Sequence, residues 1–142
     1  MHTVSQLLQT KGHTVETVEQ DSTVYDALAI MADKGIGALV VLHSGKPIGL
    51  FSERDYARNI ILKGRASKET KVSQIMSTHV VVAHPDQSIE ECMAIMTEKR
   101  VRHLPVMQDE ELIGIISIGD LVKAIIENQQ FMIEQLVSYI NG

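Results

Sequence analysis

The chain contains two copies of one sequence pattern, and this repeat limits the folds that it can adopt. Residues 21–61 match residues 86–126 at a constant shift of 65 positions, without a gap. Residues 4–7 match residues 72–75 at a shift of 68, so the copies differ by three residues in the loop before the first strand. A unit of about 60 residues buries too little surface to be comfortable alone, so the two copies are expected to pack face to face.

The apolar residues of each copy change their spacing in the same order, which predicts strand, helix, strand, strand and helix. The β-branched run at residues 80–82 predicts a short strand, and residues 14–18 are its weaker counterpart. A buried helical stripe follows in each copy, formed by Val24, Ala27, Leu28 and Met31 in the first and by Ile89, Cys92, Met93 and Met96 in the second. Capping boxes are expected at the two helix starts, Thr23-x-x-Asp26 and Ser88-x-x-Glu91.

Two further strands and a second helix complete each copy. The strands are expected at residues 38–42 and 48–51, and at 104–107 and 113–116, joined by turns at 44–46 and 109–111. The second helix begins near Ser52 or Ser117. The expected fold class is α+β (α/β), with two β-α-β-β-α repeats related by pseudo-two-fold symmetry. The expected domains are residues 1–66 and residues 67–142.

Composition and charge exclude several classes of protein. Hydrophobic residues make up 44% and charged residues 22% of the chain, which is the balance of a soluble globular protein. The net charge of −5 gives no general attraction to nucleic acid or to anionic lipid, so neither is an expected partner. The longest nearly apolar run, residues 35–42, is too short to span a membrane. The single cysteine, Cys92, and the lack of a signal peptide predict a cytoplasmic location.

The same corner motif, Gly-x-x-Ser-x-x-Asp, occurs in both copies, at residues 49–55 and 114–120. A serine followed three residues later by an acid is itself a capping box, so the motif has a purely structural interpretation. A helix start also presents unpaired N–H groups to phosphate, and a nearby carboxylate can accept hydrogen bonds from ribose hydroxyls. The two roles can coexist.

The copies differ where a cleft would be lined. The first copy has Gly37 and Ala38 before its central strand, whereas the second has Arg102 and His103. A guanidinium beside the helix start would bind phosphate in a bidentate way, although a solvated arginine is an equally ordinary interpretation, and a histidine at a strand end is more often simply packed.

The sequence resembles the tandem CBS-domain pair, or Bateman module, and in particular the small stand-alone CBS-domain proteins. The resemblance rests on residues 72–76 (VSQIM), on residues 102–106 (RHLPV), and on the two corner motifs in this order. It implies a regulatory protein that is not an enzyme and requires no cofactor. Such a module binds adenosine compounds, namely AMP, ADP, ATP, S-adenosylmethionine or NAD(H), and signals to an effector protein that the sequence does not identify.

The resemblance also implies which residues bind the ligand. Asp55 and Asp120 would hold ribose hydroxyls, Ser52 and Ser117 would contact phosphate, Arg102 and His103 would complete the phosphate pocket, and Thr78 and Val80 would enclose the base. Gly37 and Ala38 depart from the basic pair, which argues for unequal sites. Arg54, or Arg65 and Ser67 in the linker at residues 63–71, are candidates to replace it, although this segment also suits a solvated linker.

The remaining features point to association rather than catalysis. The six histidines lack the spacing of a metal site, and no acid, base or nucleophile constellation is evident. Apolar residues continue from Ile125 to Ile140 at helical spacing, which predicts an extension of the last helix that covers its own core or a second subunit. We therefore expect a homodimer. The alternative function is a scaffold or interaction module without a ligand.

Overall fold

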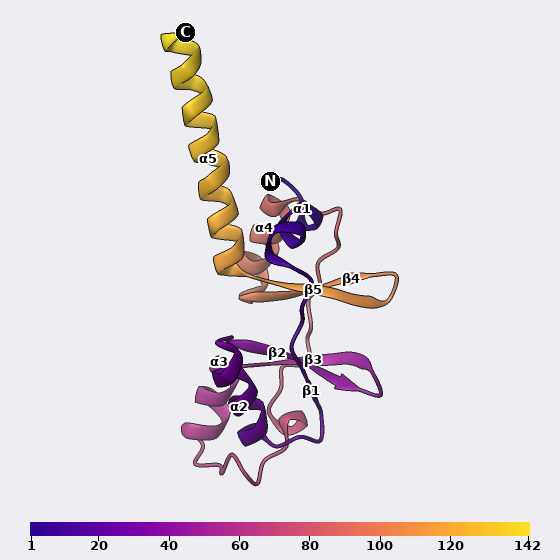
Figure 1. Ribbon diagram of the computed structural model, residues 1–142. Coiled ribbons are helices and arrows are strands. Elements are labelled where there is room, and N and C mark those ends of the chain that lie inside the picture. Colours follow the sequence, from indigo (N-terminus) through magenta and orange to yellow (C-terminus); the bar gives the residue numbers. More distant parts are fainter. The chain divides into compact units, whose positions relative to one another are not determined.

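The computed structural model describes residues 1–142, which form two packing units. One unit comprises Val15–Val80, and the other comprises Met1–Thr14 together with Val81–Gly142. Both contain helices and strands, so the predicted mixed fold class is confirmed (Figure 1). None of the helices has the length and apolar character needed to cross a bilayer.

The unit Val15–Val80 is built on a three-stranded sheet in the order β1-β2-β3. Strand β1 runs parallel to β2, and β2 runs antiparallel to β3. Its elements are β1 (Thr17–Glu19), α2 (Val24–Lys34), β2 (Ala38–His43), β3 (Lys46–Ser52), α3 (Glu53–Tyr56), the π-helical turn η1 (Ala57–Ile61) and the 3-10 turn η2 (Val72–Gln74). Its core centres on Val24, Leu39, Val41, Phe51 and Val72, all fully buried.

The other unit contains a two-stranded antiparallel sheet, β4-β5, and three helices. Its elements are α1 (Val4–Lys11), α4 (Ile89–Lys99), β4 (His103–Gln108), β5 (Glu111–Ser117) and α5 (Ile118–Asn141). Its core centres on Leu8, Ile89, Leu104, Ile116 and Leu121, again fully buried.

The packing units differ from the sequence division at residues 66 and 67. The leading segment of each copy, residues 1–14 in the first and 67–80 in the second, packs with the other copy. The first leading segment, with α1, belongs to the unit of the second copy, and η2 belongs to the unit of the first. Matched glycines make both contacts possible. A Cβ on Gly114 would lie 2.7 Å from Leu8 Cδ2, and a Cβ on Gly49 would lie 2.8 Å from both Met76 Sδ and the carbonyl oxygen of Ser77.

The main helices and hairpins follow the predicted pattern. The stripe residues Val24, Ala27, Met31, Ile89, Cys92 and Met96 are buried. Both hairpin turns have positive φ at their two central residues, 51° and 77° at Ser44 and Gly45, and 51° and 67° at Asp109 and Glu110. Turns of this kind match the twist of the flanking strands. The hydroxyls of Thr23 and Ser88 accept the expected N–H bonds, but the reciprocal carboxylate bonds of those two capping boxes do not form.

The predicted strand at residues 80–82 is wrong, whereas its weaker counterpart does form β1. In the first copy, the N–H of Val40 donates to the carbonyl oxygen of Glu16 at 3.3 Å. Pro105 occupies the position equivalent to Val40 and has no N–H to donate, so the corresponding bond cannot form. The second copy retains only a single bridge, between Ala83 and Val106.

The linker at residues 63–71 is tied to the first copy rather than simply solvated. The carbonyl oxygens of Thr70 and Ser67 accept hydrogen bonds from the first two N–H groups of α2, those of Val24 and Tyr25, at 2.8 and 3.1 Å. The linker therefore satisfies donors that a helix start otherwise leaves unpaired.

The two glycine contacts predict different costs of adding a methyl group. We expect Gly49→Ala to lower the free energy of unfolding by about 1–3 kcal/mol, because the new Cβ meets a backbone carbonyl that cannot move alone. Gly114→Ala should cost less, because the new Cβ meets the terminal methyl groups of one leucine. Urea unfolding of both variants measures this difference. Equal losses would mean that the buried side chain of Leu8 yields no more easily than the backbone of residue 77.

Candidate functional site

Both corner motifs form complete capping boxes at the start of a helix. The Ser52 N–H donates to Asp55 Oδ2 at 2.9 Å, and the Asp55 N–H donates to Ser52 Oγ at 3.2 Å. The matching distances at Ser117 and Asp120 are 2.8 and 3.1 Å. The structural interpretation of the motif is therefore realised in both copies. What the corners can do beyond capping depends on the hydrogen-bonding groups that remain.

A carbonyl group beside the neighbouring strand accepts a hydrogen bond from one further N–H group at each helix start. Ala38 pairs with Ser52, and His103 pairs with Ser117, in the strand registers. The carbonyl of the preceding residue accepts the first helical N–H, at 3.1 Å from Glu53 to Gly37 and at 2.9 Å from Ile118 to Arg102. The serine hydroxyl takes the third N–H. Only the second N–H of each helix, that of Arg54 or Gly119, remains for an external anion.

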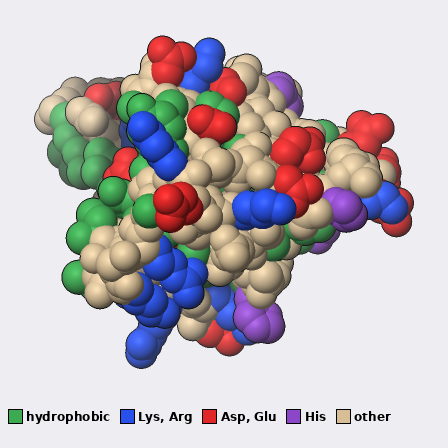
Figure 2. Space-filling view, turned by 90° about the horizontal axis from the view of Figure 1, so that it is seen from below, with side chains coloured by type: hydrophobic (Ala, Val, Ile, Leu, Met, Phe, Trp, Pro, Cys, Tyr) green, Lys and Arg blue, Asp and Glu red, His purple; other side chains and the backbone are tan.

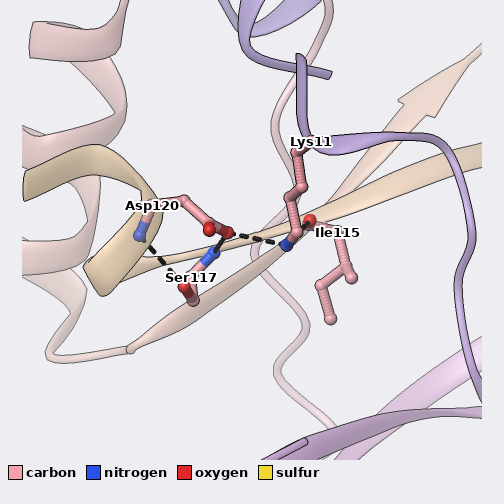
Figure 3. Close-up of polar contacts among 4 residues, drawn as sticks. All are labelled: Lys11, Ile115, Ser117 and Asp120. Atoms are coloured by element: carbon pink, nitrogen blue, oxygen red, sulfur yellow. Dashed lines mark hydrogen bonds and ion pairs between the residues drawn. The ribbon is translucent and has the colours of Figure 1, made fainter. Parts of the chain in front are cut away.

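Asp120 is held by a lysine from α1, which the sequence analysis did not identify (Figure 3). The ammonium group of Lys11 lies 2.6 Å from Asp120 Oδ2 and 2.6 Å from the carbonyl oxygen of Ile115. Asp120 Oδ2 therefore accepts from both Lys11 and the Ser117 N–H, whereas Oδ1 accepts no hydrogen bond within the protein. This corner retains one carboxylate oxygen for a ligand donor.

The contact with Lys11 also sets the charge of the carboxyl group. Burial raises the pKa of Asp120, but hydrogen bonds from Lys11 and Ser117, together with the Lys11 charge, outweigh burial. The pKa of Asp120 therefore lies below its ordinary value of 3.8, and the group is ionised at neutral pH.

Asp55 has a different neighbour and no unused oxygen. Its Oδ1 accepts from Ser77 Oγ at 3.0 Å, and its Oδ2 accepts from the N–H and the Oγ of Ser52. Ser77 is held in place by two backbone hydrogen bonds with Leu50. Thr78 follows directly and accepts from the Val80 N–H at 3.0 Å, so the predicted base-binding residues lie next in the chain to a contact of the Asp55 corner.

The other predicted residues lie at the start of β4, at the start of α3 and in the linker. The Arg102 side chain is exposed, as is that of Arg54, and His103 is half-buried at the start of β4. The Arg65 N–H donates to the carbonyl oxygen of Ile60 at the end of η1, and Ser67 caps α2. Neither linker residue makes a polar contact with the Ser52 corner. Their proposed replacement of the basic pair stays a prediction.

A small pocket of about 180 Å³ opens beside Asp120, between α1 and α5. Its lining includes two cations and two anions, contributed by Lys11, Lys123, Asp120 and Glu127. Its volume is below the roughly 300 Å³ at which sites for whole small molecules begin, so it can take part of a nucleotide.

Other reactive groups are buried or dispersed. Burial, with a smaller contribution from Glu91, raises the pKa of the Cys92 thiol to about 11. No group of three metal-ligating side chains comes together. Acidic and basic side chains are interspersed on the face drawn in Figure 2, and neither sign covers it.

Lys11 and Ser77 are the two site residues that sequence reasoning missed. Each lies shortly after a residue that packs on one of the matched glycines. Lys11 comes after Leu8, which packs on Gly114, and Ser77 comes after Met76, which packs on Gly49. The signal was present in the two repeat shifts, which align Leu8 with Met76 and Gly49 with Gly114. The sequence did not indicate that each segment packs with the other copy.

Two similar units with the same capped corner define a duplicated fold, and comparison with known proteins identifies the family. The CBS domain model matches residues 5–62 and 72–127, so the chain belongs to the CBS-domain family. The mitochondrial CBS domain-containing protein CBSX3 of Arabidopsis thaliana is 38% identical over 149 residues, covering 99% of this chain and 72% of the relative. A solved protein with CBS domains from Burkholderia ambifaria is 51% identical with a TM-score of 0.86, covering 89% and 96% of the two chains.

More distant structures show what related folds bind and how they assemble. The CBS pair of protein MJ0100 was solved with 5′-methylthioadenosine and S-adenosyl-L-methionine; it is 20% identical, with a TM-score of 0.78 over 89% of this chain and 97% of that one. The CBS-CP12 protein of bloom-forming cyanobacteria is hexameric; it is 29% identical, with a TM-score of 0.76 over 84% and 69% of the chains.

The ion pair between Lys11 and Asp120 predicts a pH-dependent contribution to stability. Because Lys11 lowers the folded-state pKa of Asp120, the pair stabilises the fold above about pH 4, and this is lost as the pH falls through the lower folded-state pKa. The two side chains are 34% and 26% exposed. Lys11→Met should therefore cost only about 0.5–1 kcal/mol at pH 7 and less near pH 2, where the bond from Lys11 to the Ile115 carbonyl remains.

Urea unfolding of the wild type and Lys11→Met at both pH values measures this effect. Lys123→Met is the matched control, because Lys123 lines the same pocket without pairing with Asp120. A loss of equal size at both pH values would mean that Lys11 stabilises the fold through packing and its bond to the Ile115 carbonyl, and not through its pairing with Asp120.

Proposed function

We propose that this protein is a non-catalytic regulatory module that binds an adenosine-containing ligand at the Asp120 corner. The observation that carries the proposal is the state of Asp120: ionised, fixed by Ser117 and Lys11, and left with Oδ1 unbonded at the edge of a pocket. A fixed carboxylate oxygen is a suitable acceptor for a ribose hydroxyl. The adenosine class follows from the family, and the ligands of the distant MJ0100 pair agree with it.

Lys11 extends the proposed site toward phosphate. An ammonium group has three N–H donors, and Lys11 uses two of them, for Asp120 and for the carbonyl of Ile115. The third donor is available to a phosphate oxygen, with Lys123 as a second cation on the same pocket. The N–H of Gly119, together with the exposed Arg102, would add anion contacts at the helix start. AMP, ADP, ATP and NAD(H) all carry such phosphates.

The two corners are proposed to be unequal. Both oxygens of Asp55 already accept hydrogen bonds from Ser52 and Ser77, so a ribose hydroxyl there must share Oδ1 with Ser77 or displace it. The Asp55 corner is therefore the weaker site. We further propose a cytoplasmic homodimer that changes its packing for an effector protein when ligand prefers one state. The hexameric CBS-CP12 protein shows that other assembly sizes occur in related proteins.

Calorimetric titration with AMP and with adenosine tests whether Asp120 binds the ribose and Lys11 binds the phosphate. Asp120→Asn should weaken binding of both ligands about ten- to a hundred-fold, the worth of a charge-assisted hydrogen bond. Lys11→Met should weaken AMP binding more than adenosine binding, because adenosine has no phosphate for Lys11 to contact. Asp55→Asn is the matched control and should leave the tighter site unchanged. Unaltered AMP binding in Asp120→Asn would remove Asp120 from the site.

The alternative is a scaffold that binds no small molecule, and the complete capping boxes at both corners favour it. A thermal-shift panel of AMP, ATP, NADH and S-adenosylmethionine separates the two functions. A ligand at a hundred times its dissociation constant stabilises the folded state by about 2.7 kcal/mol, which raises the Tm by several degrees. If no compound raises the Tm by even one degree at millimolar concentration, the scaffold function stands instead.

A further inference from the structure

The last helix leaves its own unit halfway along its length. Its buried residues are Leu121 and Ala124, and every residue from 129 to 142 is exposed. Figure 1 shows the distal half of α5 extending beyond α1 and α4 of the same unit. The match to the CBS family ends at residue 127, so this half lies outside the family pattern. The predicted extension therefore does not cover its own core.

The exposed half carries a continuous apolar stripe. Positions spaced alternately four and three residues apart fall on one helix face. In α5 these positions are Val122, Ile126, Gln129, Ile133, Leu136 and Ile140, and only Gln129 is polar. The apolar members are 42–78% exposed, and Met132, Val137 and Tyr139 widen the stripe on its two sides. This seam, residues 122–140, has the pattern of a helix that packs along another helix.

An uncovered seam of this kind is unfavourable in water. Helical segments of about 12–15 residues are marginal by themselves, and helical stability comes mainly from packing of the apolar face. When a second helix covers this seam, its exposed apolar side chains lose contact with water, and this burial favours association.

The charge of the segment narrows the choice of partner. Residues 124–142 contain no lysine or arginine, and their only charged residues are Glu127 and Glu134. Helices that lie on membranes depend on basic residues along the polar face, as does binding to nucleic acid. A strongly charged protein partner would likewise find little to recognise. A second copy of the same helix offers a matching apolar stripe and only weak repulsion.

We propose that the seam of α5 packs against α5 of a second copy of this chain and holds the subunits together. This inference deepens the homodimer proposed above and rests on it, since it names the surface that joins the subunits. It does not depend on nucleotide binding, because none of the apolar seam residues lines the Asp120 pocket, although Lys123, Ala124 and Glu127 on another side of the same helix do.

The test compares two double variants of the full-length chain by sedimentation velocity between about 1 and 100 µM. Ile133→Glu with Leu136→Glu places charge within the seam, and Gln135→Glu with Ser138→Glu adds the same charge to the opposite face, whose one large apolar residue is Phe131. All four positions are exposed, so the fold should survive, which circular dichroism checks. We expect the wild type and the opposite-face variant to be oligomeric and the seam variant to have half that mass or less.

The outcomes distinguish the proposed homodimer from the proposed seam. A monomeric wild type across this range overturns both the homodimer and the seam. A seam variant that keeps the wild-type mass overturns the seam while leaving the homodimer in place. An opposite-face variant that dissociates as completely as the seam variant shows that added charge acts nonspecifically, and it also overturns the seam. A larger assembly that only the seam variant breaks supports the pairing.

Discussion

The close packing of each leading segment on a glycine of the other copy is the contact on which the rest of this structure depends. Gly114 admits Leu8, and Gly49 admits Met76 and the backbone of Ser77, at distances that leave no room for a side chain. Because α1 is packed in this way, Lys11 reaches Asp120. Because residues 76 and 77 are packed in the same way, Ser77 reaches Asp55. The glycines therefore bring a second side chain to each capping carboxylate.

The two corners show how one motif acquires two chemistries. Both carboxylates cap a helix, and in both the neighbouring strand takes one further helix donor. A lysine beside Asp120 keeps that group ionised and leaves an oxygen and an ammonium donor unused, whereas a serine beside Asp55 takes its remaining oxygen. The capping role and the proposed ligand role are compatible at Asp120, because the bonds from Ser117 and Lys11 both fall on Oδ2. At Asp55 they compete for the same atoms.

Much of the fold could be predicted from sequence because repeated local patterns carry it. The helical stripes, the hairpin turns and both corner boxes appear where their spacing placed them, and the CBS resemblance is confirmed. The strand at residues 80–82 was wrong because a strand needs a donor on its neighbour, and Pro105 lacks one. The proposed ligand roles of Arg102, Thr78, Arg65 and the other candidates stay predictions, since each depends on surroundings that spacing alone does not describe.

The sequence by itself determined the duplication, the order of elements within each copy, and the serine and aspartate that cap each second helix, because all of these arise from contacts between residues near one another in the chain. Only the tertiary structure decided which copy each leading segment joins, which side chain meets each carboxylate, and where α5 leaves its core. Those contacts link residues more than a hundred positions apart, as Lys11 and Asp120 are, or only 22 apart but on different elements, as Asp55 and Ser77 are. Periodicity records which side of an element is apolar, but it does not record what that side will touch.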